Sequence, residues 1–289
     1  MARWQAELAL DARANLGEGP VWDARTNELL WVDIMAGLVH RFDPLTGTDV
    51  SVDVGQPVGA VVPRAAGGYA LAVRDGFAVA DTHLDDVRLV APVDHERPNV
   101  RMNDGACDSS GRFWAGTMHV DEIPGAGSLY RFGADGRVET MLGNVTVSNG
   151  IGWSPDDTVM YYADTPTLGV DAFDYDAASG TISNRRRVVT IEEDAGQPDG
   201  VAVDEDGYLW IALWEGWAVR RYSTDGTLIG IVEIPVARVT KPAFGGAALD
   251  ELYVTTAAPD APDAKQPLAG GIFLARPGVH GLRANAYAG

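Results

Sequence analysis

The sequence predicts an all-β protein, and within that class a six-bladed β-propeller whose four-stranded blades surround a central channel. Two observations lead to this prediction. Short strands rich in aromatic and β-branched residues alternate with turns, and the 289 residues include 34 Gly and 16 Pro to make those turns. In addition, one strand–turn unit recurs along the chain. No stretch of 12 or more residues keeps a helical period without Gly or Pro, so we expect no long helix.

Each unit opens with a Gly that follows a polar or small residue and precedes a short apolar strand. An aromatic strand follows, such as Leu30-Trp31-Val32 or Leu209-Trp210-Ile211, and a third strand often ends in Arg-Phe or Arg-Tyr. Successive units are 40 to 50 residues long, which is typical of a propeller blade. Six units predict six blades in one domain over residues 1–289. The opening glycines are Gly19, Gly59, Gly105, Gly150, Gly200 and Gly245.

Three tryptophans occupy equivalent positions in the second strands of their units, at Trp31, Trp114 and Trp210. Large aromatic side chains at one position of a repeat indicate packing between blades, so we expect these three to lie in the core. A ring of blades must also be closed. The segment from Trp4 to Leu10 alternates like a strand, and we expect it to form the outer strand of the last blade, beside Gly271–Leu274.

Composition and charge exclude several classes of function. The formal net charge of −19, from 41 acidic and 22 basic residues, would repel a phosphate backbone, so we expect no nucleic-acid partner. The N-terminal residues carry charges throughout and do not resemble a signal peptide. No run of about 18 apolar residues exists, so we expect no membrane span. Cys107 is the only cysteine, which fits a reducing compartment, and we expect a cytoplasmic protein.

A possible site emerges from residues that precede the opening glycines. Glu18, Asn149 and Asp199 stand directly before a Gly at matching positions of three units, and Asn103-Asp104 precede Gly105. In a propeller the first strand of each blade lines the channel, so equivalent positions converge around the axis. The spacing leaves open whether Asn103 or Asp104 faces the channel. Asp-Gly and Asn-Gly pairs are also ordinary turns, and only their coincidence in register favours a site.

Carboxylates that converge in a partly dry site repel each other unless a counter-charge is present. A divalent cation is the simplest counter-charge, and oxygen ligands favour hard ions such as Ca²⁺, Mg²⁺ or Mn²⁺. Three protein ligands would leave coordination positions open for water and substrate. The histidines share no metal-binding spacing, which argues against a zinc site built from nitrogen and sulfur ligands. They are His40, His83, His95, His119 and His280.

Several motifs together resemble one known family. The chain is similar to the senescence marker protein/gluconolactonase/regucalcin family from about residue 14 to 275, and His119 and Thr240-Lys241-Pro242 resemble its bacterial pentonolactonase branch. The motifs that carry the resemblance are Leu16-Gly17-Glu18-Gly19-Pro20-Val21-Trp22, Asn103-Asp104-Gly105, Phe113-Trp114-Ala115-Gly116-Thr117-Met118, Gly127-Ser128-Leu129-Tyr130-Arg131, Ser148-Asn149-Gly150 and Pro198-Asp199-Gly200.

The resemblance implies a propeller of metal-dependent sugar lactonases, with roles for particular residues. Glu18, Asn149 and Asp199 match the family's metal ligands, and Asp199 also matches its proposed general base. Arg101 and Asn103 match residues that contact the substrate. The family often has an acidic residue shortly after the Gly-Thr-Met stretch that binds sugar hydroxyls. In this chain Asp121 or Glu122 would take that place. The sequence here, His119-Val120-Asp121-Glu122, departs from the family pattern, and this departure bears on the substrate preference.

We therefore expect hydrolysis of sugar (aldono-)lactones to aldonic acids, with one divalent cation that polarises the lactone carbonyl and Asp199 as the base for the attacking water. Ca²⁺ is the first candidate, and Zn²⁺, Mn²⁺, Mg²⁺ and Fe²⁺ are alternatives. The expected partner is a small sugar lactone, and the expected state is a monomer or weak dimer. Three other functions stay open: a phosphotriesterase or arylesterase propeller, a propeller that binds a protein, and a calcium-binding regulator.

Overall fold

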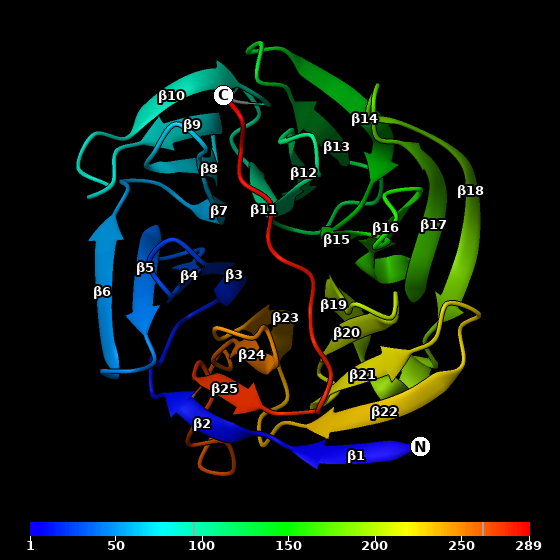
Figure 1. Ribbon diagram of the computed structural model, residues 1–289. Coiled ribbons are helices and arrows are strands. Elements are labelled where there is room, and N and C mark those ends of the chain that lie inside the picture. The colour runs from blue at the N-terminus through cyan, green and yellow to red at the C-terminus, as the bar shows by residue number, and fades with distance from the viewer. Residues whose placement is uncertain (95, 262) are drawn as a thin grey trace.

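Six small β-sheets stand in a ring around a central axis in the computed structural model, which describes residues 1–94, 96–261 and 263–289 (Figure 1). The sheets are the blades of a six-bladed β-propeller, and the prediction of an all-β fold is confirmed. One strand of each blade lies nearest the axis. These inner strands are β3 (Gly17–Asp23), β7 (Val58–Pro63), β11 (Val100–Cys107), β15 (Ser148–Trp153), β19 (Gln197–Val203) and β23 (Val239–Gly245).

Each inner strand pairs with the next strand along the chain, and the blade grows outward from there. The second strands are β4 (Glu28–Asp33), β8 (Tyr69–Val73), β12 (Phe113–His119), β16 (Val159–Asp164), β20 (Leu209–Trp214) and β24 (Glu251–Thr256). The third strands are β5 (Leu38–Asp43), β9 (Gly76–Ala80), β13 (Gly127–Phe132), β17 (Gly169–Asp176), β21 (Ala218–Tyr222) and β25 (Ile272–Ala275). The outer strands are β6 (Thr48–Asp53), β10 (Arg88–Pro92), β14 (Val138–Val145), β18 (Thr181–Thr190), β22 (Leu228–Glu233) and β2 (Glu7–Leu10).

The ring is closed at the sixth blade, where β2 from the N-terminal region pairs antiparallel with β25. This confirms the expected closure for Glu7–Leu10. The prediction is wrong for Trp4 and Gln5, because β1 (Ala2–Gln5) adds to β22 as a parallel fifth strand of the fifth blade. The Trp4 ring lies 5.6 Å from that of Trp210, so the apolar contact directs β1 to this blade. The N-terminal segment thus joins two blades, and one blade has five strands instead of four.

The core lies between the blades, where the predicted tryptophans are confirmed as fully buried: Trp31, Trp114 and Trp210 are each at most 1% exposed. Each indole N–H nevertheless finds a carboxylate. Trp114 donates to Asp108 and Trp210 to Asp204, both at 2.9 Å, and these two aspartates directly follow their inner strands. A buried indole needs such an acceptor, so the repeat supplies a Trp together with an Asp.

All six inner strands share a shift of register with their second strand at about the same depth, between Glu18 and Val21 in β3, for example, and between Pro198 and Val201 in β19. Such irregularities turn a side chain away from its normal direction and are common next to functional sites. In β23 the shift lies between Val239 and Lys241. The assignment of Gly245 as the sixth opening glycine is therefore wrong, because Gly245 ends β23, whereas Thr240 is the residue at the register shift.

Helical structure among the described residues consists of two single turns, η1 (Thr165–Thr167) and η2 (Glu193–Ala195). No helix there is long and apolar enough to cross a membrane. After β25 the chain crosses the end of the channel as an irregular strap and finishes near β10, on the opposite side of the ring. We refer to residues 281–289 as the C-terminal strap.

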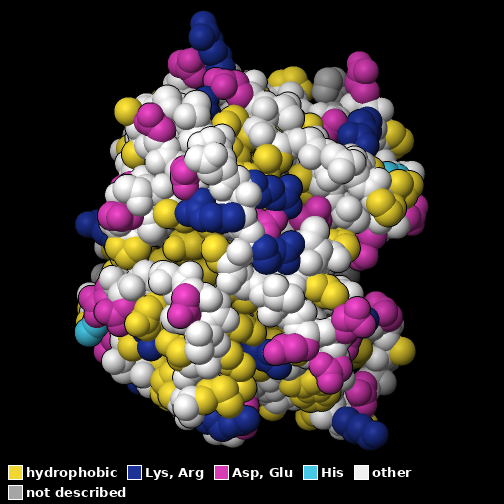
Figure 2. Space-filling view, turned by 90° about the vertical axis from the view of Figure 1, so that its right-hand side faces the viewer, with side chains coloured by type: hydrophobic (Ala, Val, Ile, Leu, Met, Phe, Trp, Pro, Cys, Tyr) yellow, Lys and Arg dark blue, Asp and Glu magenta, His cyan; other side chains and the backbone are white. Residues whose placement is uncertain are grey.

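Lys and Arg side chains gather near the middle of the side of the ring where β17 and β18 lie, with acidic side chains around them (Figure 2). Arg185 and Arg187 of β18 both pair with Asp171, at 2.7 and 2.6 Å, and Arg186 pairs with Asp174. Each of these three arginines is therefore paired within its own blade, with two of them sharing one carboxylate.

Candidate functional site

Three polar side chains from three inner strands lie at one end of the channel, each at the register shift of its strand. Glu18 and Asn149 are 4% exposed and Asp199 is 6% exposed. The Glu18 and Asp199 carboxyl groups are near enough that each affects the pKa of the other. The structure therefore brings together the three side chains that the sequence proposed as ligands.

Hydrogen bonds fix these side chains but leave an oxygen or a lone pair free on each. Glu18 Oε2 accepts the Gly19 N–H at 2.7 Å, which leaves its second oxygen directed elsewhere. Asn149 Oδ1 accepts Asn103 Nδ2 at 3.0 Å and keeps a second lone pair. Asp199 Oδ1 is buried and has no hydrogen-bond partner among the described residues. A buried carboxylate oxygen without a donor is costly, so the arrangement fits a bound cation.

The electrostatics of the site point in the same direction. Burial, and next the charge of Asp104, raise the pKa of Glu18 to about 7. Burial also raises the pKa of Asp199 well above its usual range, and the charges of Glu18 and Asp104 add to this effect. Two buried acids that disfavour simultaneous ionisation can both be ionised if a cation binds between them.

The described residues contain no group of three or more His, Cys, Asp and Glu side chains arranged to hold a metal. The candidate set differs from such a group because its third member is the Asn149 carboxamide. Carboxamide oxygens are normal ligands of hard cations such as Ca²⁺, so two carboxylates and one amide suit a hard ion better than Zn²⁺.

Arg101 and Asn103 line the same end of the channel on β11. Arg101 Nη1 donates to Asn103 Oδ1 at 2.6 Å, and Asn103 Nδ2 donates to the Ser148 carbonyl and to Asn149 Oδ1. Burial lowers the pKa of Arg101 to about 10, while Glu18, Asp199 and Glu122 counteract this effect. The guanidinium stays charged at neutral pH, and the chain of hydrogen bonds links it to the candidate ligand Asn149.

The structure gives Asp121 and Glu122, the two acids after the Gly-Thr-Met stretch, different surroundings. The Asp121 side chain is 76% exposed, and one of its oxygens lies 3.8 Å from His119 Nδ1. The negative charge of Glu122 helps to raise the pKa of Arg101, so Glu122 lies within electrostatic reach of that arginine. Glu122 also has a positive φ of 51°, so this turn holds it in an uncommon backbone conformation. Glu122 is exposed as well, but its charge reaches Arg101, and this favours Glu122 over Asp121 as the acid nearer the site.

Asp104 and Lys241 form a buried ion pair that sequence reasoning missed. Lys241 Nζ donates to Asp104 Oδ1, and both side chains are almost inaccessible to solvent. Asn103 and Asp104 are thus both buried, and each bonds a residue of another blade: Asn103 bonds Asn149 and Asp104 bonds Lys241. The repeat pattern did not reveal Lys241, because Gly245 was taken as the sixth opening residue and the register shift lies instead beside Lys241.

Thr165, at the start of η1, is a second residue that the sequence did not reveal. Its Oγ1 accepts Asn149 Nδ2 at 2.8 Å and donates to the Pro198 carbonyl at 2.9 Å. Thr165 therefore fixes which way the Asn149 carboxamide points and ties the fourth blade to the fifth. It follows the second strand β16, where the repeat pattern assigns no role.

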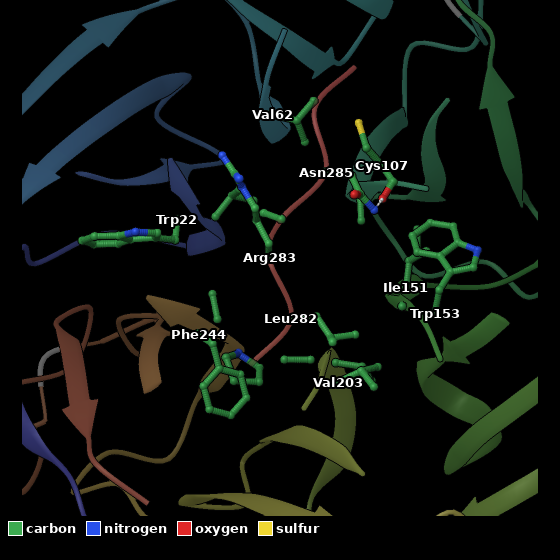
Figure 3. Close-up of a pocket in the computed structure, with 18 of the residues that line it drawn as sticks. Trp22, Val62, Cys107, Ile151, Trp153, Val203, Phe244, Leu282, Arg283 and Asn285 are labelled. Atoms are coloured by element: carbon green, nitrogen blue, oxygen red, sulfur yellow. Dashed lines mark hydrogen bonds between the residues drawn. The ribbon is translucent and has the colours of Figure 1, made fainter. Parts of the chain in front are cut away.

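A cavity of about 320 Å³ occupies the channel beyond Lys241, at the end away from the candidate ligands. The C-terminal strap crosses this cavity, and Leu282, Arg283 and Asn285 of the strap lie among its lining residues (Figure 3). Asn285 Nδ2 donates to the Cys107 carbonyl at 3.3 Å. The channel thus has a polar end with the candidate site and a mainly apolar end covered by the strap.

Fold and site together define a class: six-bladed propellers with a buried cluster of oxygen-bearing side chains at one end of the axial channel. Within that class, the chain belongs to the family described as the SMP-30/Gluconolactonase/LRE-like region, whose family model matches residues 16–258. This confirms the resemblance seen in the sequence.

Individual relatives match over the full length. Regucalcin from Danio rerio is 40% identical over 296 residues, and the match covers 100% of both chains. A luciferin-regenerating enzyme superposes with a TM-score of 0.92 and 33% identity, covering 98% of this chain and 99% of that one. A calcium-binding protein, regucalcin from Agrobacterium tumefaciens, superposes with a TM-score of 0.94 and 28% identity over 99% of each chain. The family supports a lactonase or a calcium-binding role for this protein.

Proposed function

We propose that this protein hydrolyses sugar lactones to aldonic acids with the help of one divalent cation held by Glu18, Asn149 and Asp199. The observation that carries the proposal is the pair of buried carboxyl groups with raised pKa beside an amide oxygen. The Arg101 guanidinium keeps N–H donors beyond those of Nη1, and these suit the hydroxyl and carbonyl oxygens of a sugar lactone. Ca²⁺ is the first candidate cation, because all three proposed ligands offer oxygen.

A cation bound to these ligands would polarise the lactone carbonyl and favour the negative charge that develops on its oxygen. Asp199 accepts a proton from the attacking water, because one of its oxygens has no other hydrogen-bond donor. Arg101 would donate to the sugar and orient it, and Glu122, whose charge acts on Arg101, would accept from a sugar hydroxyl. Asn103 holds Asn149 and Arg101 in their relative positions.

Substitution of Asp199 tests this assignment. Asp199→Asn keeps the shape of the side chain but removes both the base and one ligand charge, so hydrolysis of an aldonolactone should slow by about two to three orders of magnitude. Asp225→Asn is the matched control, because Asp225 forms an Asp-Gly turn that is exposed and bonded locally to Ser223. A pH-stat assay measures both rates. Wild-type turnover by Asp199→Asn would remove Asp199 from the chemistry.

The mouth of the channel supports a second candidate function. Val120, Ile123 and Trp217 are exposed apolar side chains, with exposures of 44–48%, on loops that follow strands at the end where the candidate ligands lie. Such a mouth would also accept an aryl ester or a phosphotriester. Comparison of aryl-ester, paraoxon and aldonolactone turnover separates these substrates. A calcium-binding regulator, in contrast, would bind Ca²⁺ without turnover of any of the three.

A further inference from the structure

Lys241 reaches across the channel from one side of the ring to the other. It lies on β23 of the sixth blade, and its partner Asp104 lies on β11 of the third blade, which is opposite in the ring. Only two lysines occur in the chain, and the other, Lys265, is exposed on a loop. A flexible ammonium side chain is therefore placed in a region where several carboxylates converge.

The neighbouring backbone is shaped to admit this side chain. A Cβ on Gly200 would collide with the Lys241 side chain, so the glycine after Asp199 leaves the space through which the lysine passes. Lys241 Nζ also lies 3.4 Å from the Gly105 carbonyl. A buried ammonium is tolerated only with a counter-charge and acceptors, and Asp104 and Gly105 supply them.

Asp104 is a third buried carboxylate whose charge acts on the candidate cation site. Its charge raises the pKa of both Glu18 and Asp199, so it lies within electrostatic reach of both. Its Oδ1 accepts Lys241 Nζ and the Gly105 N–H, whereas Oδ2 is buried and has no partner among the described residues. Lys241 opposes the effect of Asp104 on both acids.

We propose that Lys241 is a specificity-determining residue that engages Asp104 and thereby keeps a third carboxylate out of the cation site. This inference rests on the cation site of the proposed function. With Asp104 paired, an incoming cation meets two carboxylates and an amide. The site then binds a divalent ion weakly enough to leave it available to a substrate oxygen, because affinity for hard cations rises with the number of charged ligands.

The test is the affinity of chelator-treated protein for Ca²⁺, measured by titration calorimetry at fixed pH and salt. Lys241→Met keeps the stem and removes the charge, so Asp104 is released and the affinity should rise at least tenfold. Asp104→Asn/Lys241→Met removes both charges and should return the affinity to within about threefold of wild type. Unchanged affinity in Lys241→Met, or equal tightening in the single and double variants, would overturn the inference.

Two further variants keep the test decisive. Lys265→Met removes the other lysine and should leave Ca²⁺ affinity unchanged. Asp104→Asn alone leaves the Lys241 ammonium without its counter-charge, so Ca²⁺ affinity should fall at least threefold, and an unchanged value would count against the proposal even if Lys241→Met does not fold. Absence of Ca²⁺ binding by the wild type would instead refute the cation site itself. The two failures are therefore distinguishable.

Melting temperature provides a readout that is independent of turnover. In the cation-free state, Lys241→Met buries an additional unpaired carboxylate and should melt below wild type. Saturating Ca²⁺ should then raise the melting temperature of Lys241→Met by more than it raises that of wild type, since tighter binding stabilises more. An equal rise in both proteins would contradict the release of Asp104.

Discussion

At the scale of single residues, the site depends on two buried acids, Glu18 and Asp199, whose negative charges a bound cation would compensate. Glu18 and Asp199 were identifiable from the sequence because each precedes a Gly at the same place of a repeat. Thr165 and Lys241 were not, since one follows a second strand and the other lies in a strand without the expected polar–Gly pair. Comparison of the repeats identifies residues that share a position in the blade. It does not identify residues that act by holding a neighbouring side chain.

The raised pKa of Glu18 predicts how stability changes with pH in the cation-free protein. Between the usual value of 4.5 and about 7 the folded state binds more protons than the unfolded state, so stability falls as pH rises through this window. The loss from Glu18 is roughly 3 kcal/mol, at 1.36 kcal/mol for each pKa unit. Thermal melting of chelated protein from pH 5 to 8 measures it.

Glu18→Gln is the control for this pH dependence, because it cannot ionise and should flatten the slope between pH 5 and 7. Added Ca²⁺ should also reverse the trend in wild type, since a cation favours the ionised acids. An equally steep slope in Glu18→Gln would assign the effect to other groups.

At the scale of elements, a blade is held together by a Trp, an Asp and an Arg from three different segments. In the fifth blade, Trp210 and Arg221 both donate to Asp204, and the Arg221 guanidinium lies 5.2 Å from the Trp210 ring centroid. The third blade repeats part of this arrangement with Asp108, Trp114 and Arg131. The sequence predicted the Trp and Arg positions from the repeat, but it did not reveal that an Asp after the inner strand serves both.

Asp204→Asn should destabilise the protein by about 3 kcal/mol, because it leaves the largely buried Arg221 without its partner carboxylate. Asp206→Asn is a matched control. Asp206 approaches the same arginine at 3.4 Å but is 61% exposed, so its removal should change stability by less than about 1 kcal/mol. Denaturant titration measures both. Equal losses would show that Asp204 contributes no more than a surface pair.

At the scale of the whole molecule, two segments from the ends of the chain hold the ring of blades together. β2 completes the sixth blade, as the sequence predicted, and the C-terminal strap then connects blades across the channel. Gly281 donates to Leu249 and Tyr287 donates to Pro63, both at 2.8 Å. The strap could not be predicted, because irregular backbone has no hydrophobic period and some of its contacts, such as that of Arg64 with Gly289, join residues more than 200 positions apart.

The strap should stabilise the ring mainly through Tyr287, which is buried, stacks on Phe132 and donates to the Gly133 carbonyl. Tyr287→Ala should therefore cost about 3 kcal/mol of stability. Arg283→Ala, in the same strap but exposed, should have little effect. The melting temperatures of the two variants test this prediction. Equal values would mean that the strap covers the cavity but does not stabilise the ring of blades.

The central claim is that a divalent cation at Glu18, Asn149 and Asp199 is required for lactone hydrolysis. The most direct measurement is the rate of aldonolactone hydrolysis by chelator-treated protein, before and after addition of Ca²⁺, Zn²⁺, Mn²⁺, Mg²⁺ or Fe²⁺. The account predicts a loss of at least two orders of magnitude on chelation and recovery with at least one cation. Near-full activity in the chelated, dialysed protein would contradict it.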